Sequence, residues 1–383
     1  METSARVCFM KPSCRALDGW QCPYGLRGWR LFPPRLHMKP THFVVPETVF
    51  VPRIHSPDFS GASRRPRVPS TGMKDFSPIV MVLLTLGYGA DRGAAQSDKW
   101  GNPTTQKAEF YAASDVPHSQ IELTRQWHET AAKAWGNYGP LEFWIVGSSE
   151  TAARKLDKRY CGVRKQKDPS LSLKHCLNRG HNFVSYAKDG NAGLNTRRNK
   201  NEKWSGFIIT MSARRPGPEE EDYKPVVLHE YFHVYQHAHI LSRNESVRES
   251  LNQKNPWWGE GGAEYMAQLL YSRQEGVRPG YLKETMKRKL RSLKDLRKGE
   301  NIKDIPYGRR GRISYDLGAW FIAFIISRSS EESYRVRFFK ELNSKGFEGA
   351  FVKSFGQSSK DLLDEFHNGF LQLDLEEQMK IIP

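Results

Sequence analysis

Apolar residues recur at roughly helical intervals from residue 119 to Trp135, and the pattern ends at Gly136. Residues spaced in this way line one face of a helix, and glycine commonly follows a helix end. The run LEFWIVGS (141–148) is short, largely apolar and flanked by Gly-Pro and Gly-Ser, which is typical of a strand. A serine then opens SSETAARKLDKRY (148–160), which predicts a helix with a serine cap.

Two later segments complete the first half of the pattern. HNFVSYAKDGNAGLN (181–195) shows alternation and an Asp-Gly pair, which predicts a hairpin, and KWSGFIITMSA (203–213) predicts a strand. From Pro225 to the end the pattern is almost entirely helical. We therefore expect an α+β fold in which a mixed α/β part (96–225) and a helical part (226–383) form one domain.

The first 72 residues have a different composition. They contain ten of the 22 prolines and three of the five cysteines, and no helical or strand period persists there. We expect residues 1–72 to be an extension upstream of a mis-assigned start codon. A genuine disordered arm is the alternative.

Residues 73–95 have the three parts of a secretory signal peptide. Met73 is followed by a lysine, by an apolar run from about Pro78 to Leu86, and by small residues that end at Ala95. The run is too short for a bilayer, which needs about 20 residues. We therefore expect a chain that is secreted or periplasmic.

The net charge of +17 first suggests an anionic partner. Residues 1–72 carry eleven Lys/Arg and four Asp/Glu, so they supply +7 and leave +10 for the other 311 residues. The segment 283–299 combines Lys and Arg with Leu at helical spacing, which favours a solvated helix face. We expect no nucleic-acid partner, and at most weak association with an anionic cell surface.

Two cysteines follow the expected signal peptide, Cys161 and Cys176, at a separation of 15 residues. An even pair in an exported chain indicates a disulfide, here closing a basic loop. Two unrelated thiols are the alternative. A zinc site is disfavoured, because neither residue has a second cysteine close to it in the sequence.

The segment VVLHEYFHVYQHAHI (226–240) contains four histidines, and His229 and His233 enclose Glu230 in an HExxH pattern. On a helix, residues four apart lie on one face, about 6 Å apart along the axis. Both imidazoles can therefore reach one ion, whereas Glu230 is rotated off that axis and can hold a water molecule. A histidine-rich core helix is the alternative, unless the chain supplies a third ligand.

Two nearby histidines are weak candidates for that ligand. His237 lies about 12 Å along the helix from His229, which is too far for both to bind one ion. His239 stands where metzincins have their third histidine, but Gln236 replaces the glycine that breaks the helix in that pattern. We expect His237 and His239 to be polar residues at the helix end.

Two glutamates in WWGEGGAEYMA (257–267) are stronger candidates. Glu260 at the start of the next helix completes a His-His-Glu set, the ligand number of a catalytic zinc site. Glu264, one turn later, can accept the second N–H of a ligating histidine. Either glutamate alone would be an ordinary helix carboxylate.

HEYFH followed by WWGEGGAEYMA resembles the gluzincin zinc metallopeptidases, in particular the peptidase-MA-like group. The resemblance covers about residues 115–375. It implies a thermolysin-like zincin fold with His229, His233 and Glu260 as ligands of one Zn²⁺ per chain and Glu230 as general base. It also implies an edge strand over the site that binds extended substrate by β-addition, and GFIITMSA (206–213) lies at the appropriate place.

Members of this clan stabilise the oxyanion with a tyrosine or histidine on a later helix. Tyr315, at the start of an apolar helix, is the first candidate and Tyr307 the second. A half-buried aromatic with no catalytic role is the alternative for Tyr315.

These features together predict an exported zinc metallopeptidase, a monomer that hydrolyses peptide or protein substrates through a zinc-bound water and a glutamate base. Three alternatives stay open. The first is a metzincin-type protease with His239 as third ligand. The second is a catalytically inactive binding relative, and the third is a basic surface-binding protein whose histidines are structural.

Overall fold

The computed structural model describes residues 100–214, 217 and 221–383. The expected extension (1–72) and signal peptide (73–95) lie outside the described residues. The two parts predicted for the rest of the chain, a mixed α/β part and a helical part, both appear in the described structure.

Among the described residues, four short strands form one mixed sheet in the order β1-β2-β4-β3. Their bounds are Glu109–Ala112 (β1), Leu141–Val146 (β2), Ala192–Arg197 (β3) and Gly206–Ser212 (β4). Strands β1, β2 and β4 run parallel, and β3 pairs with β4 in the antiparallel direction, with Asn195 opposite Ile208. The strands predicted over 141–148 and 203–213 are therefore confirmed as β2 and β4.

Strand β4 does not have the place that was expected of it. It is paired on both sides, with β2 and with β3, so it is a central strand and its backbone cannot receive a substrate strand. The edge next to it is β3, which also packs against helix α5 (Tyr223–Ala238). The apolar composition of β4 marks a strand that is covered on both faces, but it does not show whether the strand lies at an edge or inside a sheet.

The two helices predicted for the first half of the chain are confirmed as α1 (His118–Trp135) and α2 (Glu150–Lys167). Gly136 follows α1 with a φ of 100°, a conformation that residues with a side chain rarely adopt. The side chain of Ser149 caps α2 by accepting the N–H of Ala152 at 3.2 Å.

The hairpin predicted over 181–195 is wrong. Phe183–Asp189 form helix α4, and β3 begins only at Ala192. Phe183, Tyr186 and Ala187 are buried, a spacing of three and four that belongs to a helix and was mistaken for alternation.

The cysteine pair connects two helices rather than closing an open loop. The Sγ atoms of Cys161 in α2 and Cys176 in α3 (Leu173–Arg179) are 2.10 Å apart, at the distance of a disulfide. The pairing expected from the sequence is therefore present.

A buried cluster of charged side chains connects α2 to the sheet. Glu142 of β2 is fully buried, and its carboxylate contacts Arg164 and Lys167 of α2, the lysine at 2.7 Å. A buried carboxylate needs such partners, because an unpaired charge is costly away from water.

From α5 onward the described chain is helical, as its pattern predicted. The helices are α5 (Tyr223–Ala238), α6 (Glu245–Asn252), α7 (Pro256–Ser272), α8 (Tyr281–Lys289), α9 (Gly311–Arg328), α10 (Phe339–Phe355), α11 (Ser359–Asn368) and α12 (Leu375–Met379). Short 3-10 turns occupy Leu290–Asp295, Ile302–Asp304 and Phe370–Gln372, and a π-helical turn, Ser333–Phe338, precedes α10.

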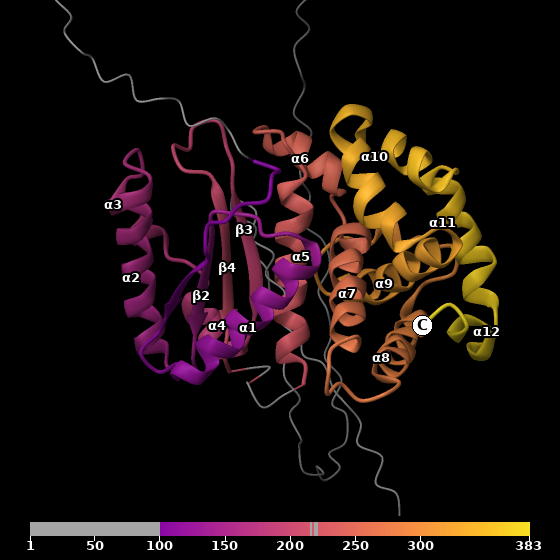
Figure 1. Ribbon diagram of the computed structural model, residues 1–383, viewed down its shortest axis with the longest axis horizontal. Coiled ribbons are helices and arrows are strands. Elements are labelled where there is room, and N and C mark those ends of the chain that lie inside the picture. Colours follow the sequence, from indigo (N-terminus) through magenta and orange to yellow (C-terminus); the bar gives the residue numbers. More distant parts are fainter. Residues whose placement is uncertain (1–99, 215–216, 218–220) are drawn as a thin grey trace, which may run out of the picture. The chain divides into compact units, whose positions relative to one another are not determined.

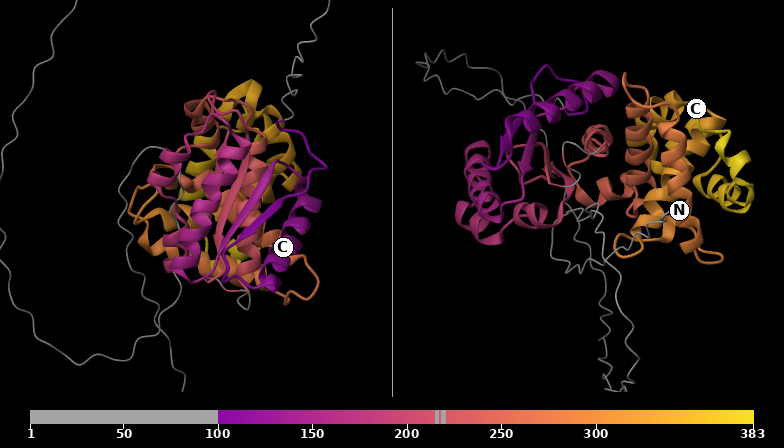
Figure 2. Two further views of the ribbon diagram at one scale, coloured as in Figure 1. Left: turned by 90° about the vertical axis from the view of Figure 1, so that its left-hand side faces the viewer. Right: turned by 90° about the horizontal axis from the view of Figure 1, so that it is seen from below.

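The elements stack in layers with α5 near the middle. Helices α2 and α4 pack on one face of the sheet, and α5, which α1 accompanies, packs against β3 and β4 (Figure 1). Helix α7 packs on α5, and α9 packs on α7. The right-hand view of Figure 2 shows α5 almost end-on, between the sheet and the C-terminal helices.

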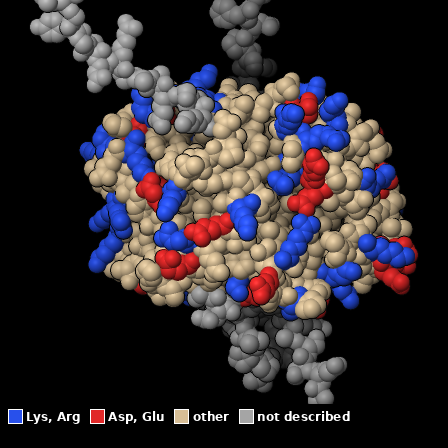
Figure 3. Space-filling view, viewed as in Figure 1, with Lys and Arg blue, Asp and Glu red and all other residues tan. Residues whose placement is uncertain are grey.

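Charged residues of both signs lie on the surface of the described part of the chain. On the face drawn in Figure 3, basic and acidic side chains are interspersed. Most Lys and Arg side chains of residues 283–299 are exposed, with Lys289 a notable exception.

No helix in the described part of the chain is long and apolar enough to cross a membrane.

Candidate metal centre

Helix α5 positions two of the predicted ligands. The side chains of His229 and His233 lie on one face of α5 and are 12% and 10% exposed. The helix is apolar around most of its circumference because the sheet, α1 and α7 all pack against it. Its two imidazoles are therefore held between layers of the fold and not at a free surface.

Helix α7 brings the third predicted ligand to α5. Glu260, at the start of α7, is 3% exposed. The next residue, Gly261, touches Gly318 of α9 so closely that a Cβ there would lie 2.5 Å from the carbonyl carbon of Gly318. The glycines after Glu260 therefore let α7 lie tightly between α5 and α9, with the glutamate directed at α5.

Three ligand atoms converge where these helices meet. The Nε2 atoms of His229 and His233 are 3.1 Å apart, and Oε2 of Glu260 lies 3.2 and 3.0 Å from them. Zn–N bonds of about 2.0–2.1 Å in a tetrahedron place neighbouring ligand atoms about 3.3 Å apart. The triangle thus has the size of one face of such a tetrahedron. It is one of two such clusters of metal-ligating groups among the described residues.

The hydrogen bonds of the two Nδ1 atoms fix the tautomers of His229 and His233. Nδ1 of His229 lies 3.1 Å from the carboxylate of Glu264, and Nδ1 of His233 lies 2.8 Å from Oε1 of Gln236. The amide of Gln236 is itself oriented, because its Nε2 donates to the carbonyl of Gly259 at 2.9 Å. Both acceptors require Nδ1–H donors, so neutral imidazoles present bare Nε2 atoms to the triangle.

Gln236 is the residue that sequence reasoning missed. In the sequence it stands out only as the replacement for the glycine of the metzincin pattern. Its position three residues after His233 places it on the same helix face, which was the available signal.

Glu264 has the supporting place that was expected of it, and it belongs to a larger charge network. Its Oε1 lies 2.8 Å from Nζ of Lys289, which also contacts Asp316 at 3.3 Å. Lys289 is 14% exposed, so it does not belong to the solvated face predicted for this segment. Burial opposes ionisation, but Lys289 and His229 hold the pKa of Glu264 well below its usual range.

Glu230, the predicted base, lies beside the triangle and not in it. It is 6% exposed, and its Oε2 has no hydrogen-bond partner among the described residues. Burial raises its pKa, and the charges of His229 and His233 oppose that rise in part. A buried carboxylate with an uncommitted oxygen has the properties of a proton acceptor.

The tyrosine hydroxyl that the structure places at the triangle belongs to Tyr307. It donates to Oε1 of Glu260 at 2.9 Å. The ring of Tyr315, the first candidate from the sequence, lies edge-on to Tyr307 with centroids 6.4 Å apart. Tyr315 therefore packs beside Tyr307, whose hydroxyl contacts Glu260.

The two remaining histidines of α5 lie outside the triangle. Nδ1 of His239 contacts the carbonyl of Tyr235 at 2.7 Å, and its ring packs against Tyr138 and Phe339. His237 is half-buried, and burial lowers its pKa to about 3. Both histidines therefore lie at the helix end as expected, and both are half-buried.

The carboxylates make the triangle attractive to positive charge. Burial alone would lower the pKa of His229, but hydrogen bonds with Glu260 and Glu264 outweigh it and raise the pKa to about 10. The pKa of His233 is also raised, because the charge of Glu260 outweighs burial. Protons and metal ions therefore compete for the same atoms.

Comparison with protein-family models, with curated proteins and with solved structures finds no match to this chain. The residues of the triangle and their surroundings must therefore carry the functional proposal.

Proposed function

We propose that this protein is an exported zinc-dependent metallopeptidase of the gluzincin type, with one Zn²⁺ per chain and a peptide or protein substrate. The observation that carries the proposal is the triangle of His229 Nε2, His233 Nε2 and Glu260 Oε2, in which no two atoms are more than 3.2 Å apart. Both Nδ1–H groups are committed elsewhere, so three electron-rich atoms face one another. A divalent cation balances such a cluster, and two histidines with one glutamate are a known ligand set of catalytic zinc.

The arrangement of elements supports a thermolysin-like fold as part of this proposal. The HExxH helix, α5, packs against the sheet, and α7 adds the glutamate from the opposite side. Strand β3 is the edge of the sheet that packs on α5. We assign to β3 the role first expected of β4, the binding of an extended substrate through main-chain hydrogen bonds.

Each residue around the triangle then has a chemical role. When bound, zinc would polarise the scissile carbonyl and activate water. Glu230 takes a proton from the attacking water and returns it to the leaving amine. Glu264 and Gln236 hold the imidazoles in the tautomer that leaves Nε2 free to bind. Tyr307 replaces Tyr315 as the first candidate for donating a hydrogen bond to the oxyanion.

Metal content and peptide cleavage test the proposal together. We expect about one zinc per purified chain and hydrolysis of members of a quenched fluorescent peptide library. Glu230→Gln should keep the zinc and lower the rate by about 10²–10⁴-fold, the contribution of a general base. Glu260→Ala should lose the zinc.

His239→Ala is the matched control, because this histidine is on α5 but outside the triangle. It should keep both zinc and activity. Loss of zinc from His239→Ala with retention by Glu260→Ala would make the protein a metzincin. Folded protein that takes up no zinc would refute the proposal, and full zinc with no cleavage of any peptide would favour an inactive binding relative.

A further inference from the structure

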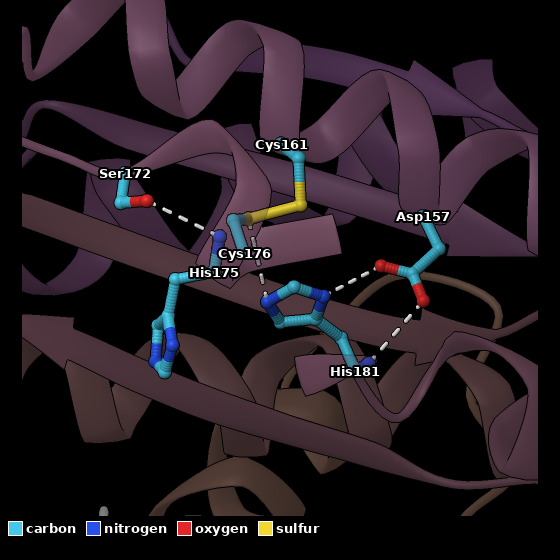
Figure 4. The surroundings of a disulfide bond; sticks show 6 residues. All are labelled: Asp157, Cys161, Ser172, His175, Cys176 and His181. Atoms are coloured by element: carbon cyan, nitrogen blue, oxygen red, sulfur yellow. Dashed lines mark hydrogen bonds and ion pairs between the residues drawn. A yellow bond between two sulfur atoms is a disulfide. The ribbon is translucent and has the colours of Figure 1, made fainter. Parts of the chain in front are cut away.

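A second cluster of metal-ligating side chains surrounds the cysteine pair. It lies on α2, α3 and the turn before α4, on the face of the sheet opposite α5 (Figure 1). The ring of His181 lies between the carboxylate of Asp157 and the sulfur of Cys176 (Figure 4). This cluster is independent of the proposed zinc centre.

Asp157 holds His181 at two points. Oδ1 of Asp157 lies 2.5 Å from Nδ1 of His181, and Oδ2 accepts the backbone N–H of the same residue at 3.2 Å. Because an ionised carboxylate only accepts, Nδ1 of the neutral imidazole carries the proton and Nε2 is bare. The fold therefore fixes the ring, its tautomer and the direction of its lone pair.

That lone pair is directed at sulfur. Nε2 of His181 lies 3.8 Å from Sγ of Cys176. A disulfide sulfur has no proton to donate, so the oriented imidazole gains no hydrogen bond from the closed bridge. A histidine oriented by a carboxylate, with its second nitrogen directed at thiolate ligands, is the arrangement that metal sites use.

We propose that reduction of the Cys161–Cys176 disulfide converts this cluster into a metal site, in which both thiolates and Nε2 of His181 bind one thiophilic cation such as Zn²⁺. The three ligand atoms already lie within 4.8 Å of one another. Tetrahedral coordination with Zn–S bonds of about 2.3 Å needs sulfur atoms about 3.8 Å apart, a separation that the opened bridge permits. The spacing of the cysteines alone does not indicate this site, because the third ligand, His181, comes close to the sulfurs only in the folded chain.

Burial favours a cation once the bridge is open. Cys161 and Cys176 are 1% and 5% exposed, so their thiolates need a positive partner. His181 and Asp157 are 16% and 18% exposed, which leaves the histidine side of the cluster open to solvent.

A dithiol is the co-reactant that reduces the Cys161–Cys176 disulfide. Its two thiols supply two electrons and two protons, the S–S bond of the protein breaks, and the reductant is left as a disulfide. Binding of the cation then displaces one proton from each cysteine. The closed bridge is the form for an oxidising compartment, and the metal site is the form for a reducing one.

Cobalt titration tests the proposal on the whole chain carrying Cys8→Ser, Cys14→Ser and Cys22→Ser, so that Cys161 and Cys176 are its two remaining cysteines. The chain is reduced with a dithiol, desalted without oxygen and titrated with Co²⁺, beside an oxidised sample. We expect a thiolate-to-cobalt charge-transfer band that saturates at one ion per reduced chain and disappears on addition of Zn²⁺. The oxidised sample should show no such band, because the triangle on α5 and α7 contains no sulfur.

Variants identify the ligands. The double variant Cys161→Ser/Cys176→Ser should show no band, and His181→Ala should bind Co²⁺ at least about 10-fold more weakly. His175→Ala is the matched control, because this exposed neighbour directs its ring away from the sulfurs (Figure 4). A reduced and folded chain with two titratable thiols and no band would overturn the proposal. So would equal affinity in His181→Ala, or loss of the fold on reduction.

Discussion

Substitution of Glu264 by glutamine tests how the surroundings of His229 determine metal affinity. One carboxylate oxygen of Glu264 lies 3.1 Å from Nδ1 of His229, and the other lies 2.8 Å from Nζ of Lys289. Gln268 also donates to Glu264, at 3.0 Å, so glutamine keeps the shape but has one acceptor oxygen for three donors. Whichever donor faces the amide N–H₂ group loses its hydrogen bond.

The structure sets the size of two separate effects. Loss of an outer partner of a ligating histidine weakens metal binding by about 10- to 100-fold, or about 1.4–2.7 kcal/mol. Lys289, 14% exposed, keeps Asp316 at 3.3 Å as an acidic partner. We therefore expect the free energy of unfolding to fall by about 3 kcal/mol, the lower end for breaking a buried ion pair.

A double variant separates these effects. Glu264→Gln/Lys289→Met removes the ammonium group that has lost one of its two carboxylate partners, so it should recover most of the lost stability and none of the zinc affinity. Competition with a chromophoric chelator measures affinity, and urea unfolding of the zinc-stripped chain measures stability. Zinc affinity equal to that of the unaltered chain in folded Glu264→Gln would refute the role assigned to this carboxylate.

Three further predictions follow from the contacts. Tyr307→Phe should lower kcat/KM by about 10²–10³-fold when zinc is saturating, the loss expected for one oxyanion donor. If Tyr315→Phe has that effect instead in peptide-cleavage kinetics, the role returns to Tyr315. Because the pKa of His229 is raised to about 10, its contribution to the stability of the zinc-stripped chain is full below its unfolded pKa and lost as pH rises through about 10. Urea midpoints should fall over that range more than they do in His229→Ala, and equal profiles would contradict the assignment. Arg164→Met should lower the free energy of unfolding by about 3 kcal/mol, because the buried Glu142 loses its buried cation and keeps Lys167 and the indole N–H of Trp144. A loss below about 1 kcal/mol in urea unfolding would show that the lysine suffices.

The features predicted well are those that depend on short stretches of chain. Helices α1 and α2 follow from apolar spacing and a serine cap, and the two histidines of HExxH share a face because a helix repeats every 3.6 residues. Glu260 was identified from a second local pattern, and the structure places it with both histidines.

The features predicted poorly depend on packing between distant segments. The buried positions of α4 are spaced as in a helix, but seven residues are too few for periodicity to override an Asp-Gly pair. Strand β3 is the edge next to β4, because β4 pairs on both sides. The apolar composition of β4 does not reveal this order of strands.

Lys289 shows most clearly why local sequence patterns do not predict the electrostatic surroundings of the site. It stands among basic residues whose spacing correctly predicted an exposed helix face, and nothing in that spacing sets it apart. What sets it apart is that Glu264 of α7 and Asp316 of α9 both lie within ion-pair distance of its ammonium group. Helices α7, α8 and α9 must therefore pack together before the pKa of Glu264 is lowered and its carboxylate can orient His229. The ligands of the proposed centre are specified by two short motifs, whereas the electrostatic setting of those ligands is a property of the assembled helical half.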